Sequence, residues 1–158
     1  MLIVGWNIMD VFTVSLFGHR RADELWKLEN TLVSKIKALI QTKSYVSFLI
    51  GRNGDFDEYA ASIIKRVQKE IGKENNDITL VLPYTVSNIG YYKEYYDHII
   101  IPESTYCVYP KSAITFRNRW MIDQSDLAIF FIEHKTGGAY HTMKYAEKQN
   151  KCVFLLQL

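Results

Sequence analysis

The sequence predicts an α/β fold, a three-layer αβα sandwich in which helices cover both faces of a mainly parallel sheet. Short apolar runs alternate with amphipathic helical stretches along the chain, which is the order expected of successive strand–helix units. The stretch 126–132 is an almost unbroken apolar run, and such runs suit parallel strands buried on both faces. With 158 residues, the chain has the length of one domain, which we place at residues 11–158.

The first half of the chain predicts three strands separated by two helices. Apolar residues recur at helical spacing between the strands, with Asp23 as the N-cap of the first helix and Gly72 ending the second. The expected strands are 12–17, 45–50 and 77–82, and the expected helices are 24–42 and 56–71.

The second half begins with the least regular stretch, residues 85–111, which is bounded by turn-forming residues and rich in tyrosine. A short helix is expected around the tyrosines at 91–96, followed by a short apolar run at 98–101 that reads as a strand. The remaining expected elements are a helix containing 117–123, a strand at 126–132, a helix at 138–149 and a last strand at 152–156.

Residues 1–10 form an uncertain N-terminal extension. They are apolar but too short to span a bilayer, and they lack the basic start and the cleavage site of a signal peptide. We therefore expect a cytoplasmic protein with no membrane partner.

The net charge and the cysteine and histidine spacing bear on whether the protein binds nucleic acid or metal ions. The net charge of +2 is small and the basic residues are dispersed, so a nucleic-acid partner is not expected. Cys107 and Cys152 lack metal-ligand spacing, and Cys152 falls in an apolar strand pattern that predicts a buried, reduced thiol. The histidines have no metal-ligand pattern either, so we expect no metal and no cofactor.

Glycines and polar side chains follow the predicted strands at the points where each strand ends. In a wound parallel sheet, ligands bind beyond the carboxyl ends of the strands. These positions are Gly18-His19-Arg20, Gly51-Arg52-Asn53-Gly54, Pro83-Tyr84 and Thr136-Gly137-Gly138-Ala139-Tyr140.

The last of these turns predicts an anion site. Gly137 and Gly138 let the backbone approach a ligand, and the free N–H groups at the start of the following helix point at it. Arg117 supplies a guanidinium that matches a phosphate with two parallel hydrogen bonds. Arg119 is a second candidate, although it is spaced to pair with Asp123 four residues later, and Asp123 itself could orient Arg119 or a ligand hydroxyl.

The motifs at these strand ends, together with Arg117-Asn-Arg-Trp-Met-Ile-Asp123, resemble the short YpsA-like branch of the SLOG superfamily over residues 11–157. This superfamily includes the cytokinin-activating LOG enzymes and DprA-like proteins. The resemblance implies a Rossmann-like sheet that binds nucleotides or nucleotide-derived ligands.

The LOG enzymes cleave the N-glycosidic bond of nucleoside monophosphates, and part of their motif is present here. Arg117 and Met121 match its helix, and the paired glycines with Thr142 match its second half. The proline position of that motif holds Thr136, and its glutamate position holds Tyr145.

Several residues have more than one possible role. His19 would hold a phosphate, act as an acid or base, or cap the helix that follows. Asp57 would accept from a ribose hydroxyl or act as a dipole partner in the first turn of its helix. Tyr84, Tyr140 and the tyrosines at 91–96 predict either stacking platforms for a base or a packed lid. The chain has eleven tyrosines, so some are expected at a pocket or a subunit interface, which leaves a homo-oligomer open.

The leading function is therefore binding of a nucleotide or nucleotide-derived small molecule, as in a sensor. The alternatives are hydrolysis of a nucleotide N-glycosidic bond, with Asp57, Asp123 or Glu147 as the carboxyl group, and a protein-interaction module with a degenerate pocket. The predicted ligand-binding residues are Gly18, His19, Arg20, Gly51, Arg52, Asn53, Pro83, Tyr84, Arg117, Arg119, Asp123, Gly137, Gly138, Ala139, Tyr140 and Thr142.

Overall fold

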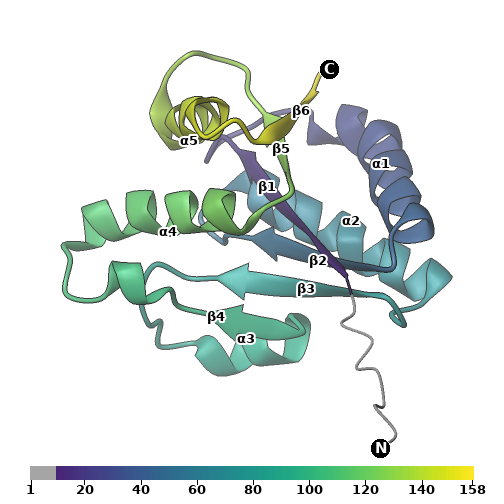
Figure 1. The fold of residues 1–158 in the computed structure, drawn as a ribbon, viewed down its shortest axis with the longest axis horizontal. Helices are drawn as coiled ribbons and strands as arrows, with labels where there is room; N and C mark the ends of the chain where they lie inside the picture. Colours follow the sequence, from purple (N-terminus) through teal and green to yellow (C-terminus); the bar gives the residue numbers. More distant parts are fainter. Residues whose placement is uncertain (1–9) are drawn as a thin grey trace, which may run out of the picture.

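A computed structural model describes residues 10–158 and shows one six-stranded parallel sheet with helices on both faces (Figure 1). The predicted N-terminal extension lies outside this range except for its last residue. The strands are β1 (Val11–Gly18), β2 (Tyr45–Ile50), β3 (Asn76–Val81), β4 (His98–Ile100), β5 (Leu127–Phe131) and β6 (Cys152–Leu156). The helices are η1 (Leu25–Leu28), α1 (Glu29–Thr42), α2 (Asp55–Ile71), α3 (Ile89–Tyr95), η2 (Glu103–Thr105), α4 (Pro110–Gln124) and α5 (Gly137–Lys148).

The strand order is β4-β3-β2-β1-β5-β6, with every neighbouring pair parallel. The chain runs outward from β1 to β4 and then crosses back to add β5 and β6 on the other side of β1. Because parallel crossovers are right-handed, this reversal puts α1 and α2 on one face of the sheet and α4 and α5 on the other. The carboxyl ends of β1 and β5 therefore form the switch point at which this class of fold binds ligands.

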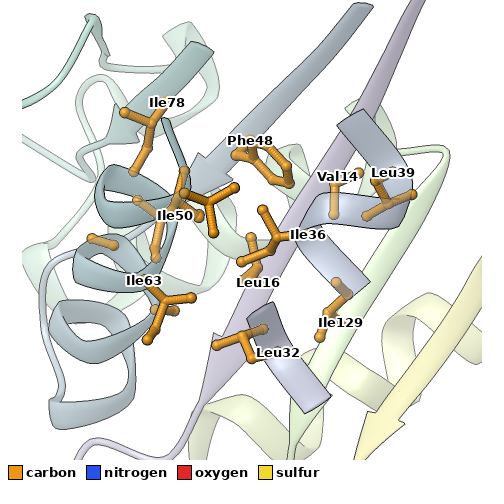
Figure 2. Close-up of a cluster of buried hydrophobic side chains, with 14 of the residues drawn as sticks. Val14, Leu16, Leu32, Ile36, Leu39, Phe48, Ile50, Ile63, Ile78 and Ile129 are labelled. Atoms are coloured by element: carbon orange, nitrogen blue, oxygen red, sulfur yellow. The ribbon is translucent and has the colours of Figure 1, made fainter. Parts of the chain in front are cut away.

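Two apolar clusters hold the three layers together. Alternate residues of a strand point to opposite faces, so Leu16 packs in one cluster and Phe17 in the other. The larger cluster joins the sheet to α1 and α2, and the smaller joins it to α4 and α5. Figure 2 shows side chains of the larger cluster from the strands and these two helices turned toward one another, among them Leu32, Phe48 and Ile63.

The start of the first helical segment differs from the prediction. A short 3-10 turn, η1, precedes α1, and Asp23 does not cap it. The residue before η1 is Glu24, which has φ 55° and makes no side-chain cap bond. Leu25 and Leu28 are three residues apart, a spacing that suits a 3-10 turn as well as an α-helix, so periodicity alone could not separate the two.

Cys152 is exposed, which corrects the prediction of a buried thiol. It begins β6, an edge strand of the sheet, where one side of the strand has no neighbour among the described residues. An apolar strand pattern predicts pairing but does not say whether the strand is central. Within residues 10–158, no helix combines the length and the apolar character that crossing a membrane requires.

Candidate functional site

A cavity of about 360 Å³ lies at the carboxyl ends of β1, β2 and β3, between α2 on one face of the sheet and α4 and α5 on the other. It adjoins the switch point, because Gly18 ends β1 and Gly138 and Ala139 begin the helix that follows β5. The predicted residues that line it are Gly18, Arg20, Gly51, Arg52, Asn53, Tyr84, Arg117, Gly138 and Ala139. An open cavity of this size argues against a degenerate pocket.

Arg117 is the most buried charged group of the cavity, with 4% of its surface exposed. Its Nη1 donates to the carbonyl of Val81 at 2.7 Å, and its Nε donates to Oδ1 of Asn118 at 2.7 Å. Both acceptors are neutral, and no carboxylate in residues 10–158 forms an ion pair with it. Burial lowers the pKa of Arg117, and the guanidinium keeps its charge because its ordinary pKa is so high.

A chain of hydrogen bonds ties this guanidinium to the start of α5. Nδ2 of Asn118 donates to Oγ1 of Thr142 at 3.2 Å, and that hydroxyl donates to the carbonyl of Gly138 at 2.8 Å. An arginine can only donate, so Asn118 must turn its oxygen toward Arg117 and its amide nitrogen toward Thr142. The chain therefore fixes Arg117 relative to the glycine turn.

The first turn of α5 leaves its backbone donors available. Its N-cap, Thr136, makes no side-chain cap bond, and Gly137 and Gly138 are exposed. Gly137 has φ 85°, a conformation that favours glycine. The N–H groups of this turn and the positive end of the helix dipole meet the cavity at Gly138 and Ala139, which is the arrangement that binds anions.

Asp57 lines the same cavity, on the first turn of α2, although the predicted set of ligand-binding residues does not include it. A methyl group placed on Gly51 would lie 3.1 Å from Oδ2 of Asp57 and 2.9 Å from Nη1 of Arg117, so both charged groups flank the end of β2. Oδ2 also accepts the backbone N–H of Asn53 at 3.1 Å. Burial raises the pKa of Asp57 to about 6, against the opposing effect of Arg117.

Arg20 and Arg52 add cations to the cavity lining. The carbonyl of Arg20 accepts the N–H of Asp55 at 2.9 Å, which holds the turn after β1 against the start of α2. Nη1 of Arg52 donates to the hydroxyl of Tyr92 at 3.1 Å, and the guanidinium lies 5.7 Å from the centre of that ring. Helix α3 thus fixes the position of Arg52.

His19 does not line the cavity and instead anchors the loop that leads to it. Its Nε2 accepts the backbone N–H groups of Glu133 at 3.0 Å and His134 at 3.3 Å, and its ring stacks on that of His134 at 3.7 Å. Burial lowers the pKa of His19, with a further contribution from His134. The neutral histidine joins the end of β1 to the segment between β5 and α5.

The other predicted residues lie around the cavity rather than on its wall. Pro83 is buried, and Thr142 belongs to the hydrogen-bonded chain described above. Two residues of α4 turn toward Tyr145 of α5. Asp123 accepts its hydroxyl at 2.8 Å, and the guanidinium of Arg119 lies 5.2 Å from the centre of its ring. Tyr140 and Gly137 are also outside the lining set.

The cavity contains residues that the sequence did not single out as ligand-binding. Asn118 had no signal of its own, because its role depends on α5 packing beside α4. Met121 was noted only for the family motif, and Phe17 as part of a strand. Gly54 belongs to the turn after β2 but not to the predicted ligand-binding set, and a Cβ on it would lie 2.8 Å from Cα of Arg20. The further lining residue is Ile114. Within the described range, no group of three His, Cys, Asp or Glu side chains is arranged to hold a metal ion.

No protein-family model matches the chain, and no curated protein matches it. Two solved structures have the same fold. DNA processing protein A from Helicobacter pylori aligns with a TM-score of 0.62 and 18% identity, over 93% of this chain and 66% of that one. DNA processing protein A (DprA) from Streptococcus pneumoniae aligns with a TM-score of 0.67 and 14% identity, over 92% of this chain and 50% of that one. The chain thus spans less than two thirds of either neighbour.

These neighbours correct one prediction. The prediction that a nucleic-acid partner is unlikely is contradicted, because both neighbours are DNA processing proteins and the structure of the Helicobacter pylori protein concerns its single-stranded DNA binding mode. That prediction rested on the small net charge and on the spread of basic residues along the sequence, and neither shows that Arg20, Arg52 and Arg117 converge on one cavity. The chain has the same Rossmann-like fold as these two proteins.

Proposed function

We propose that the cavity binds a nucleotide unit through its phosphate group. The observation that carries this proposal is Arg117, a buried guanidinium that forms no ion pair with a carboxylate of residues 10–158 and lines the same cavity as the first turn of α5. Its two hydrogen bonds use Nη1 and Nε and leave Nη2 for a ligand. An anion placed there completes the charge balance of Arg117 and accepts from the α5 backbone.

The same chemistry suits two sources of the nucleotide unit. One is a free nucleotide or nucleotide-derived molecule, which the resemblance to the SLOG superfamily supports and which would make the protein a small-molecule sensor. The other is a nucleotide within a single strand of DNA, which the single-stranded DNA binding mode of the Helicobacter pylori neighbour supports. In either case Tyr84, 38% exposed on the cavity wall, offers a ring on which a base can stack.

The test measures binding of inorganic phosphate, nucleoside monophosphates and a short single-stranded DNA by calorimetry and fluorescence anisotropy. A ligand at 100 times its dissociation constant stabilises the protein by about 2.7 kcal/mol, so thermal unfolding provides a second readout. Arg117→Lys keeps a positive charge but loses the planar fork, and we expect it to weaken binding by about 10- to 100-fold.

The matched control is Arg119→Ala, on the same helix but directed at Tyr145 and away from the cavity. It should leave affinity unchanged. Salt separates the two sources, because affinity for a DNA strand held through several phosphates falls more steeply with ionic strength than affinity for a single nucleotide. Absence of binding across the whole panel, or equal losses in both variants, would refute the proposal.

Asp57 supports a second candidate, hydrolysis of a nucleotide N-glycosidic bond. It is a cavity carboxyl group with a pKa of about 6, near the value that suits an acid–base catalyst at neutral pH. The C1′–nitrogen bond would break with its electrons passing to the base, and the protonated Asp57 would supply the proton to that nitrogen. Water would then add to C1′ and give its proton to the Asp57 carboxylate, which restores the acid. Release of free base from a nucleoside monophosphate by the wild type, lost in Asp57→Asn, is the expected result, and its absence across purines and pyrimidines would exclude the activity.

The other carboxyl groups considered for this role lie elsewhere. Asp123 accepts a hydrogen bond from Tyr145, and Glu147 is exposed and pairs with Lys144 at 2.7 Å. Neither lines the cavity.

A further inference from the structure

Asp57 and Arg117 lie beside each other without pairing. Both flank Gly51, each about 3 Å from the position that a Cβ on this glycine would take, yet the described residues form no ion pair between them. Asp57 accepts one hydrogen bond, from the N–H of Asn53, whereas a carboxylate can accept about four. Acceptor capacity therefore remains next to the group that is proposed to hold a phosphate.

A carboxylate in this position disfavours a bare phosphate. Arg117 and the first turn of α5 attract an anion, and Asp57 repels it at short range in a partly buried site. A cavity for simple anions would be better served by asparagine at position 57, whose side-chain oxygen can also accept the N–H of Asn53. The arrangement suits a ligand that carries a phosphate and, a few bonds away, a hydrogen-bond donor.

In a nucleotide, the donor nearest to the phosphate is a hydroxyl of the sugar, because the base is attached on the far side of the ring. A charged acceptor forms the stronger class of hydrogen bond with such a hydroxyl. The rest of the lining offers apolar contact through Tyr84, Ile114 and Met121, which suits the base. The 2′-hydroxyl is the group by which proteins separate ribose from deoxyribose.

We propose that the site selects ribonucleotide units, an inference that rests on the phosphate binding proposed above. Asp57 is the specificity-determining residue, because it accepts a hydrogen bond from a ribose hydroxyl. The phosphate lies between Arg117 and Gly138, and the sugar lies toward Asp57. Asp57 also accepts the backbone N–H of Asn53 and so stabilises the turn after β2. An asparagine at position 57 can still accept this N–H.

The experiment compares AMP, 2′-deoxy-AMP, 3′-deoxy-AMP and inorganic phosphate in calorimetric titrations at pH 7.5 against the wild type, Asp57→Asn and Arg117→Lys. We expect the wild type to bind AMP about 10- to 100-fold more tightly than 2′-deoxy-AMP, which lacks the hydroxyl that separates ribose from deoxyribose. In Asp57→Asn this ratio should fall below about threefold, and inorganic phosphate should bind more tightly than to the wild type because the repulsion is gone. Arg117→Lys should weaken all of the ligands and keep the ratio.

Equal wild-type affinity for AMP and 2′-deoxy-AMP overturns the inference, as does a ratio that survives in Asp57→Asn. If the ligands bind equally and Arg117→Lys still weakens them all, phosphate binding stands and ribose selection fails. If inorganic phosphate binds and none of the nucleotides does, ribose selection also fails. If nothing binds, both proposals fail together.

Discussion

Asp57→Asn is expected to stabilise the free protein at neutral pH. Burial raises the pKa of Asp57 from 3.8 to about 6, so the folded state holds this proton more tightly than the unfolded chain does. Stability is therefore greatest when Asp57 is protonated and falls as pH rises through the window from about 4 to 6. A shift of this size corresponds to about 3 kcal/mol at pH 7.5, at roughly 1.4 kcal/mol per unit, and to about 1 kcal/mol at pH 4.5.

Asparagine carries no charge to desolvate and still accepts the N–H of Asn53, so the variant should avoid most of this cost. Urea unfolding of both proteins at pH 4.5 and pH 7.5 measures the difference. Glu58→Gln is the control, because it removes an exposed carboxylate from the same first turn of α2 and should change stability by less than about 0.5 kcal/mol. An Asp57→Asn advantage that is absent, or that does not grow with pH, would show that burial does not raise this pKa.

Three further predictions concern the surroundings of the cavity. Gly18→Ala places a Cβ 2.3 Å from the ring of Phe56 and should cost about 1–3 kcal/mol in chemical denaturation, whereas Gly90→Ala, in open space on α3, should be neutral or slightly stabilising. The pKa of His19 is lowered from 6.5, so the unfolded chain binds a proton at this histidine more readily than the folded protein does, and stability falls as pH drops below about 7. His19→Gln should reduce this dependence of stability on pH. An unchanged dependence would contradict the lowered pKa. Asn118→Leu removes the acceptor of the buried guanidinium of α4 and should weaken phosphate binding about tenfold with little loss of helix content by circular dichroism; unaltered affinity would show that the hydrogen-bonded chain does not position the site.

Most of the fold could be predicted from the sequence because strand and helix periods alternate clearly. The boundaries of β2 and β6 match the prediction, since turn-forming or polar residues flank both apolar runs. The features that failed depend on neighbours in space. The sequence predicts a buried Cys152 because it does not show that β6 is an edge strand. The sequence predicts an α-helix at Leu25–Leu28 because the apolar spacing there fits both helix types.

The candidate site could be located from the sequence, but its inner composition could not. The strand-end rule brought Gly18, Gly51 and Gly138 to one cavity, and the spacing that lets Arg119 pair with Asp123 favoured Arg117 as the phosphate ligand. Asn118 acts only because two helices that are adjacent on one face exchange hydrogen bonds, which no local pattern reports. The partner prediction failed for a related reason, since a net charge contains no information on where the charges lie.

The cavity draws its walls from both helical layers of the sandwich. Asp57 belongs to α2, on one face of the sheet, whereas Arg117 and Gly138 belong to α4 and α5 on the opposite face. A molecule bound there would contact both helical layers and so link them at the edge of the sheet. Amide hydrogen exchange should then slow at the start of α2 and of α5 at the same time, although these segments lie about eighty residues apart in the chain.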